Sequence, residues 1–309
     1  MQIPVTTSGR THPYHPNVRP RLYSVIFVLT STLFAQNSAV LTNNGEPMRV
    51  NYPCAEDDLQ WAGMSCDDDT PCPVYLELSS VVPDGAKIIA AGNLHSESAT
   101  LTSILLLSED AGATWKEPTP RIRGSALDQV QFYNLQTGWA AGETQYPLAR
   151  DPFVLLTTNG GGSWRQVAVE EEGSPGSLQR FWFDSAKHGE LIIDAGKSSE
   201  GGRYLSLESE TGGDNWMLRG KSDQQPRLLH APPPGDDSGL RIRPSKDGKA
   251  FQIEQRAFDR NGAAQWKPVA SFLIETAVCK VHAGELQEPA PEPVAPVAAP
   301  PEPPRRRRR

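Results

Sequence analysis

The chain has 309 residues, of which 38% are hydrophobic and 22% charged, and a formal net charge of −7. This length is sufficient to bury a sizeable core, and all-β domains of about 200–250 residues are common as single units. The two ends are basic, so residues 36–283 between them carry a net charge of −11, which argues against nucleic acid as a partner.

The first 35 residues predict a signal peptide. Arg19 and Arg21 precede the apolar run "LYSVIFVLTSTLFA", which ends at small residues near Ala35. That run is short for a membrane span and is flanked as a secretory signal is. We therefore expect cleavage near Ala35 and an exported protein, periplasmic or extracellular, with an uncleaved membrane anchor as the alternative.

Residues 36–75 form a segment that holds three of the four cysteines, Cys54, Cys66 and Cys72; the fourth is Cys279. An even number in an exported chain predicts disulfides, and four cysteines allow three connectivities. The paired C-x2-C spacing of zinc sites is absent from the sequence. One bridge between Cys66 and Cys72 would close a short acidic loop. The other would then join Cys54 to Cys279 and lock the segment as a clasp between the start and end of the body.

Residues 76–283 contain an eight-residue repeat, "SEDAGATW", "TTNGGGSW", "SETGGDNW" and the degraded "DRNGAAQW", whose tryptophans are 49, 52 and 50 residues apart. The first copy has all the recurring positions, and the others have some of them. The repeated residues are Ser108, Asp110, Gly112, Thr114 and Trp115; Thr157, Asn159, Gly161 and Trp164; Ser209, Thr211, Gly213 and Trp216; and Asn261 and Trp266.

Short β-prone runs precede each copy, such as "SILLLSED" and "PFVLLTTNG", with further runs upstream that end at glycine. One unit of about 50 residues cannot bury both faces of its sheet alone, so neighbouring units must stack. Radial stacking leaves only short, protected edges. The sequence therefore predicts an all-β propeller of about four or five blades.

The octets themselves predict structural turns. An Asp or Asn side chain accepts hydrogen bonds from turn N–H groups, glycine supplies a positive φ, and the indole packs on the hairpin. A calcium loop needs several alternating carboxylates, whereas the first copy has the acid Asp110 and the next two have Asn159 and Thr211 in its place.

The motif S-x-D-x-G-x-T-W resembles the Asp-box, or BNR repeat. The stretch "FYNLQTGWAAGE" also resembles photosystem II assembly-factor-like propellers, so the likeness covers roughly residues 76–275.

Asp-box propellers include sialidases, other glycosidases, sorting receptors and assembly factors, so the resemblance implies a fold with the boxes at the blade periphery and no single activity. A sialidase would need three arginines, a tyrosine–glutamate nucleophile and an aspartate. The runs "RIRG" (Arg121–Gly124) and "RIRP" (Arg241–Pro244) do not match the sialidase R-I-P motif. The acidic runs Asp67–Asp69 and Glu170–Glu172 fall in expected loops and are interpreted as solvated. No catalytic residue is assigned.

The histidines His95, His188, His230 and His282 are far apart in the sequence and fit no ligand spacing, so no metal or cofactor is expected. Trp139 and the run Phe181–Phe183 are interpreted as core aromatics rather than a sugar or peptide platform.

Residues 284–309 are rich in Pro, Ala and Glu and end in Arg305–Arg309. Such a composition predicts a disordered, extended tail whose arginines can touch anionic surfaces.

Together these observations favour an exported, non-catalytic binding or assembly scaffold of the cell envelope, with an unidentified protein or glycan partner. The alternative is a glycan-acting hydrolase of sialidase-like fold.

Overall fold

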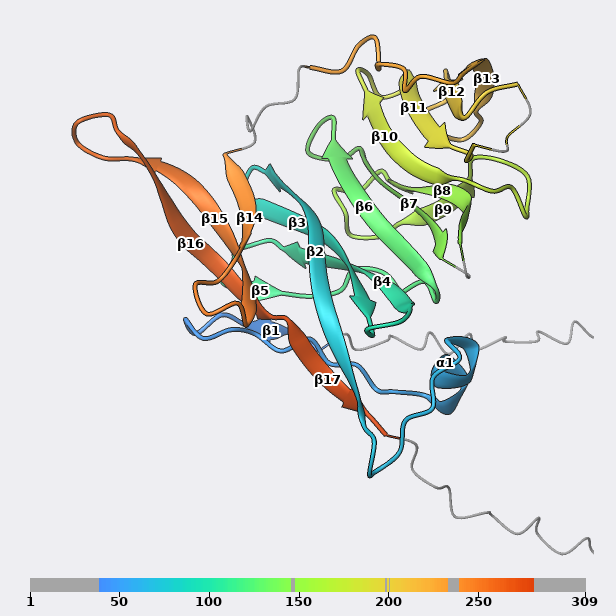
Figure 1. Cartoon of the computed structure of the whole chain (residues 1–309). Helices are drawn as coiled ribbons and strands as arrows, with labels where there is room; N and C mark the ends of the chain where they lie inside the picture. The colour runs from blue at the N-terminus through green and yellow to red at the C-terminus, as the bar shows by residue number, and fades with distance from the viewer. Residues whose placement is uncertain (1–38, 146–147, 198, 200, 233–238, 281–309) are drawn as a thin grey trace, which may run out of the picture. The chain divides into compact units, whose positions relative to one another are not determined.

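The computed structural model describes residues 39–145, 148–197, 199, 201–232 and 239–280. The signal peptide, its cleavage near Ala35, His282 and the tail with Arg305–Arg309 lie outside these residues. The described part is nearly all β, with seventeen strands and one short helix, α1 (Glu56–Trp61) (Figure 1). Within it, no helix is long and apolar enough to cross a bilayer.

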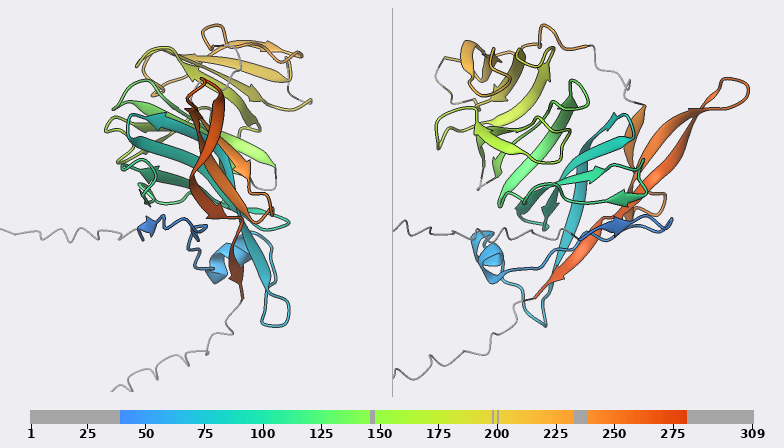
Figure 2. Two further views of the ribbon diagram at one scale, coloured as in Figure 1. Left: turned by 90° about the vertical axis from the view of Figure 1, so that its left-hand side faces the viewer. Right: turned by 180° about the vertical axis from the view of Figure 1, so that it is seen from behind.

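The strands form antiparallel sheets, three of them four-stranded (Figures 1 and 2). The first sheet has the order β17-β2-β3-β4, and a further pair joins β1 to β5. The strands of this sheet and this pair are β1 (Leu41–Thr42), β2 (Cys72–Asp84), β3 (Lys87–His95), β4 (Thr100–Ser108), β5 (Thr114–Trp115) and β17 (Glu275–Cys279).

The next two sheets are simple meanders in which each strand pairs with its successor. The second sheet consists of β6 (Ser125–Phe132), β7 (Gly138–Gln145), β8 (Ala149–Thr157) and β9 (Arg165–Ala168). The third sheet consists of β10 (Ser177–Phe183), β11 (Gly189–Asp194), β12 (Tyr204–Ser209) and β13 (Met217–Ser222). The fourth sheet has three strands, β14 (Leu240–Pro244), β15 (Ala250–Phe258) and β16 (Ala264–Leu273).

Three hydrophobic clusters join these sheets face to face. Ile89, Leu105 and Phe153 belong to the cluster between the first and second sheets, and Trp139 and Phe183 to the cluster between the second and third. The remaining cluster packs the first sheet against the fourth and against residues of the N-terminal segment. Four-stranded meanders stacked through both apolar faces are the arrangement that blades of a propeller require.

Two glycines allow neighbouring strands to approach closely at β-bulges. A Cβ on Gly142 would lie 1.8 Å from the carbonyl oxygen of Ala126, and one on Gly92 would lie 2.1 Å from that of Glu77. Because both contacts are with backbone, no side chain can move to make room. The same bulge thus recurs in the first two sheets, although the sequences of β2 and β6 share little else.

The N-terminal segment is part of the fold rather than an appendage. Leu41 pairs with Trp115, and Met48 bridges Phe272 of the fourth sheet in parallel register. The cysteines form the pairs Cys54–Cys279 and Cys66–Cys72, which confirms the connectivity favoured by the sequence.

The first sheet begins within the cysteine-bearing segment of residues 36–75. β2 begins at Cys72, because its first residues pair with β17, where Cys279 lies opposite Cys72. The loop between Cys66 and Cys72 therefore leads directly into the sheet, and the C-terminal strand closes onto it.

Candidate functional site

The first octet forms a turn between β4 and β5 that is closed by its own side chains. The Asp110 carboxylate accepts the Thr114 N–H at 2.8 Å and the Thr114 hydroxyl at 2.7 Å, and the Ser108 hydroxyl donates to it at 2.9 Å. Hydrogen bonds from Thr114 and then Ser108 lower the pKa of Asp110 to about 2. The Trp115 indole donates to the Gly112 carbonyl at 3.1 Å. The carboxylate is fully used within the turn, which supports a structural role.

The second and third copies build the same turn with other groups. The Asn159 amide oxygen accepts the Ser163 N–H at 3.0 Å, and the Thr211 hydroxyl accepts the Asn215 N–H at 2.9 Å. In the first three copies the shared glycine, at 112, 161 and 213, has a φ between 84° and 94°, which a side chain would strain. An acid is therefore dispensable in this turn, whereas the glycine is not.

The fourth copy departs from this pattern because alanine stands at position 263, where the other copies have that glycine. Its turn has positive φ only at Gly262 and is closed by Asp259, which accepts the Ala263 N–H at 2.8 Å. The tryptophans of the first three copies pack into or against the clusters between sheets. Trp266 belongs to none of these clusters and remains partly exposed.

Trp266 instead borders a cavity of about 900 Å³ between the fourth sheet and the N-terminal segment. The Arg241 guanidinium lies 4.1 Å from the centre of its ring, and Arg241 Nε is 2.7 Å from the Glu254 carboxylate. Trp266 and Glu254 thus bring an aromatic ring and an acid to one hollow, whose lining also includes Asn43, Pro47, Asp247 and Lys249, and Arg241 packs beside both. Arg241, the first arginine of "RIRP", therefore packs on the ring of Trp266.

A buried carboxyl group that the sequence analysis did not single out lies near the start of β10. The Glu143 side chain is only 2% exposed. Burial, and then the nearby Asp128, raises the pKa of Glu143 to about 7. Burial, and then Glu77, also raises the pKa of Asp128. Carboxyl groups with raised pKa values in proximity are a signature of acid–base catalysis, so this cluster is the strongest candidate catalytic centre in the described residues.

The hydrogen bonds of Glu143 indicate a different role. Its carboxylate accepts the Leu178 N–H at 3.2 Å, and so ties β7 to the first strand of the next sheet. In the preceding sheet, Asn93 accepts the Leu127 N–H at 2.7 Å in the same way. Asn93 and Glu143 each follow the glycine of an "AAG" triplet, in "IIAAGN" and "GWAAGE", so the sequence held a signal for this position.

The pH dependence of stability tests the environment of Glu143. Its pKa of about 7 in the folded protein lies above the ordinary glutamate value of 4.5. Its contribution to stability is therefore fully present below about pH 4.5 and is lost as the pH rises through 7, by up to about 3 kcal/mol. E143Q keeps an acceptor for Leu178 and cannot ionise. We expect chemical unfolding from pH 5 to 8 to show a decline for the wild type and a flatter profile for E143Q. The exposed-site control E210Q should follow the wild type, and an E143Q profile parallel to it would contradict this prediction.

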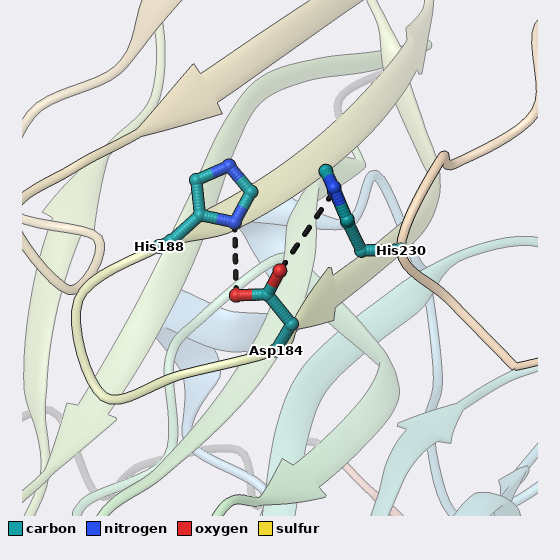
Figure 3. A group of neighbouring side chains, drawn as sticks. All are labelled: Asp184, His188 and His230. Atoms are coloured by element: carbon teal, nitrogen blue, oxygen red, sulfur yellow. Dashed lines mark hydrogen bonds and ion pairs between the residues drawn. The ribbon is translucent and has the colours of Figure 1, made fainter.

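The histidines require a correction. The expectation that they lie far apart rested on sequence spacing, but His188 and His230 have ring centres 5.1 Å apart and flank Asp184 (Figure 3). The segment that follows β13 returns along the third sheet and carries His230 to the turn between β10 and β11. His95 lies elsewhere, beside Tyr75 at the end of β3. Sequence spacing gave no signal for a contact made by a returning segment.

The other charged candidates make local contacts. Arg121 pairs with Glu117 at 2.7 Å, and Arg123 with Asp58 at 2.7 Å. Asp67 accepts the Thr70 N–H and hydroxyl, which closes the loop between Cys66 and Cys72. Glu170–Glu172 lie in the loop after β9.

The aromatic candidates lie largely in the core, as the sequence indicated. The side chain of Trp139 is 1% exposed, and those of Phe181 and Phe183 are also buried. Trp182, between the two phenylalanines, is only partly buried.

No family model matches the sequence, and a search of curated proteins found no match. Three solved structures show similarity. YCF48 bound to D1 peptide is 22% identical over 66% of this chain and 60% of that chain, with a TM-score of 0.33, and YCF48 from Cyanidioschyzon merolae is 17% identical over 63% of this chain and 57% of that chain, with a TM-score of 0.34. The alpha-L-arabinofuranosidase Arb93A from Fusarium graminearum, with an iminosugar inhibitor, is 11% identical over 74% of this chain and 74% of that chain, with a TM-score of 0.31. The chain thus spans about 60% of the length of the YCF48 chains. At these TM-scores no residue role or activity is carried over from any of them.

Proposed function

We propose that the chain is an exported, non-catalytic Asp-box propeller of four blades that binds a protein or glycan partner in the cell envelope. The four sheets would be the blades, and the N-terminal segment, paired with both β5 and the fourth sheet, would be the clasp. Two disulfides fit an oxidising compartment, which accords with the proposed signal peptide in residues 1–35.

The observation that carries the binding role is the position of Trp266. A repeat tryptophan would ordinarily be buried between sheets, and here it lines a cavity with Arg241 stacked on its ring and Glu254 holding that arginine. Binding pockets combine an aromatic surface with a few placed polar groups, and tryptophan and arginine dominate binding energies at interfaces. Loss of the box glycine at position 263 accompanies this arrangement, so the fourth repeat is the one specialised for recognition.

The alternative, a glycan-acting hydrolase, is favoured by one observation, the raised pKa of Glu143 beside Asp128. A catalytic carboxyl group must reach substrate, within about 3 Å of the proton it transfers. Glu143 is enclosed and accepts hydrogen bonds from Leu178, Ser177 and Gln145. Its equivalence to Asn93, which cannot act as an acid or base, supports the scaffold.

Binding to immobilised peptide and glycan arrays tests this proposal. We expect the full-length protein to bind either peptides or glycans on the arrays. W266A should weaken that binding at least about tenfold, because an aromatic side chain that the partner covers contributes more than about 1.4 kcal/mol. F258A is the matched control, since Phe258 is a 68% exposed aromatic on the same hairpin that does not line the cavity. Equal binding by W266A and the wild type, or loss of binding in F258A alone, would contradict the proposal.

A further inference from the structure

Three chemically suitable ligands converge beside the third sheet (Figure 3). Asp184 and His188 belong to the turn between β10 and β11, and His230 comes from the segment that follows β13. His188 Nδ1 lies 2.9 Å from one Asp184 carboxylate oxygen, and His230 Nδ1 lies 3.8 Å from the other. One donor atom from each residue lies within 4.8 Å of the other two.

These separations suit a small transition-metal ion. With metal–ligand distances of about 2.0–2.1 Å, tetrahedral coordination places neighbouring ligand atoms about 3.3 Å apart. The observed distances of 2.9 and 3.8 Å lie on either side of that value. Two imidazoles and a carboxylate are a ligand set that zinc accepts with one position left for water.

The surroundings orient the ligands as a metal site needs. The other nitrogen of His188, Nε2, lies 2.9 Å from a Glu208 carboxylate oxygen, and Arg219 pairs with that carboxylate. A histidine that ligates a metal through one nitrogen commonly donates its other N–H to a carboxylate, which fixes the ring. Glu208 therefore holds His188 with Nδ1 directed toward Asp184 and His230.

The segment that carries His230 is also held in place by the sheet. One carboxylate oxygen of Glu190, on β11, accepts the Leu229 N–H at 2.7 Å and the His230 N–H at 3.2 Å. The other oxygen of Glu190 lies 3.2 Å from His230 Nδ1. The Glu190 side chain thus holds the backbone at His230 beside Asp184, and a metal ion on His230 Nδ1 would replace the contact of that nitrogen with Glu190.

We propose that Asp184, His188 and His230 bind one divalent transition-metal ion, with zinc the best fit, and that this ion clamps residues 224–232 onto the third sheet. A second set of donors, His188, Glu208 and Glu210, lies nearby. In that set Glu208 is already paired with Arg219, which makes it a poorer ligand. The two sets share only His188. His230 belongs to the first set and Glu210 to the second, and both are exposed, so variants of these two residues form a matched pair that tests the proposal.

Calorimetric titration of the full-length, untagged protein with Zn²⁺ distinguishes the sets. We expect one equivalent to bind, H230A to weaken binding at least about tenfold, and E210Q to stay within about twofold of the wild type. Co²⁺ should give visible absorption bands of a nitrogen- and oxygen-ligated ion in the wild type that H230A lacks. H95Q controls for the loss of an imidazole elsewhere.

Proteolysis reads out the clamp independently. Arg227 is exposed and lies within the segment, so trypsin should cleave after it more slowly when Zn²⁺ is present, and EDTA should reverse the protection. H230A should show no protection. Absence of zinc binding in the wild type, retention of binding by H230A with loss in E210Q, or equal cleavage after Arg227 with and without zinc would each overturn the proposal.

Discussion

Replacing Trp139 with alanine should lower the free energy of unfolding by about 3–5 kcal/mol, the range for removing a large buried aromatic. Its ring is stacked on Phe183 of the next sheet, with centroids 3.7 Å apart and planes 1° from parallel. Its indole N–H also donates to the Gly212 carbonyl, in the third octet, at 2.8 Å. W139A would therefore open a cavity between two sheets and leave the Gly212 carbonyl without that donor.

Equilibrium urea unfolding measures this effect. F258A removes an aromatic side chain that is 68% exposed, so it should change stability by less than about 0.5 kcal/mol. A loss below about 1 kcal/mol in W139A would show that Trp139 does not hold the second and third sheets together, and would reopen its interpretation as a ligand platform.

Removing the Cys54–Cys279 disulfide in the double variant C54S/C279S should cost about 2–5 kcal/mol. The bridge spans 225 residues and joins the N-terminal segment to the last strand, so its loss restores much conformational freedom to the unfolded chain. Cys279 is also fully buried, and serine there would place a hydroxyl in an apolar cluster.

C66S/C72S is the matched control for that variant. This bridge spans only 6 residues, and loop-closure entropy grows with the logarithm of loop length, so the expected loss is smaller. Thermal unfolding under non-reducing conditions compares the two double variants directly. An equal or larger loss in C66S/C72S would contradict the view that Cys54–Cys279 locks the ends of the fold.

Features encoded within a few residues were accessible from the sequence. The bonds between Asp110 and Thr114 lie inside one octet, so the octet pattern indicated a turn without knowledge of the rest of the chain. Regular tryptophan spacing then indicated repeated sheets. The fourth octet is visibly degraded in the sequence, but its consequence, a tryptophan beside a cavity, depends on which segments pack against it.

Features that depend on neighbouring repeats were not accessible. Glu143 acquires its raised pKa and its bond to Leu178 only when the second and third sheets are stacked. His188 and His230 meet only because the segment after β13 returns along the sheet it has just left. The contact between the histidines leaves no spacing signal in the sequence, and the position of Glu143 is marked only by the recurring "AAG" triplet before it.

The central claim, that the chain binds a ligand without transforming it, is tested most directly by assaying hydrolysis. Wild type and E143Q would be incubated with aryl sialosides, arabinosides and galactosides from pH 5 to 8, a range that spans the titration of Glu143. We expect no turnover above the uncatalysed rate for either protein. Turnover by the wild type that E143Q abolishes, while its unfolding transition stays intact, would contradict the scaffold and identify Glu143 as a catalytic acid or base.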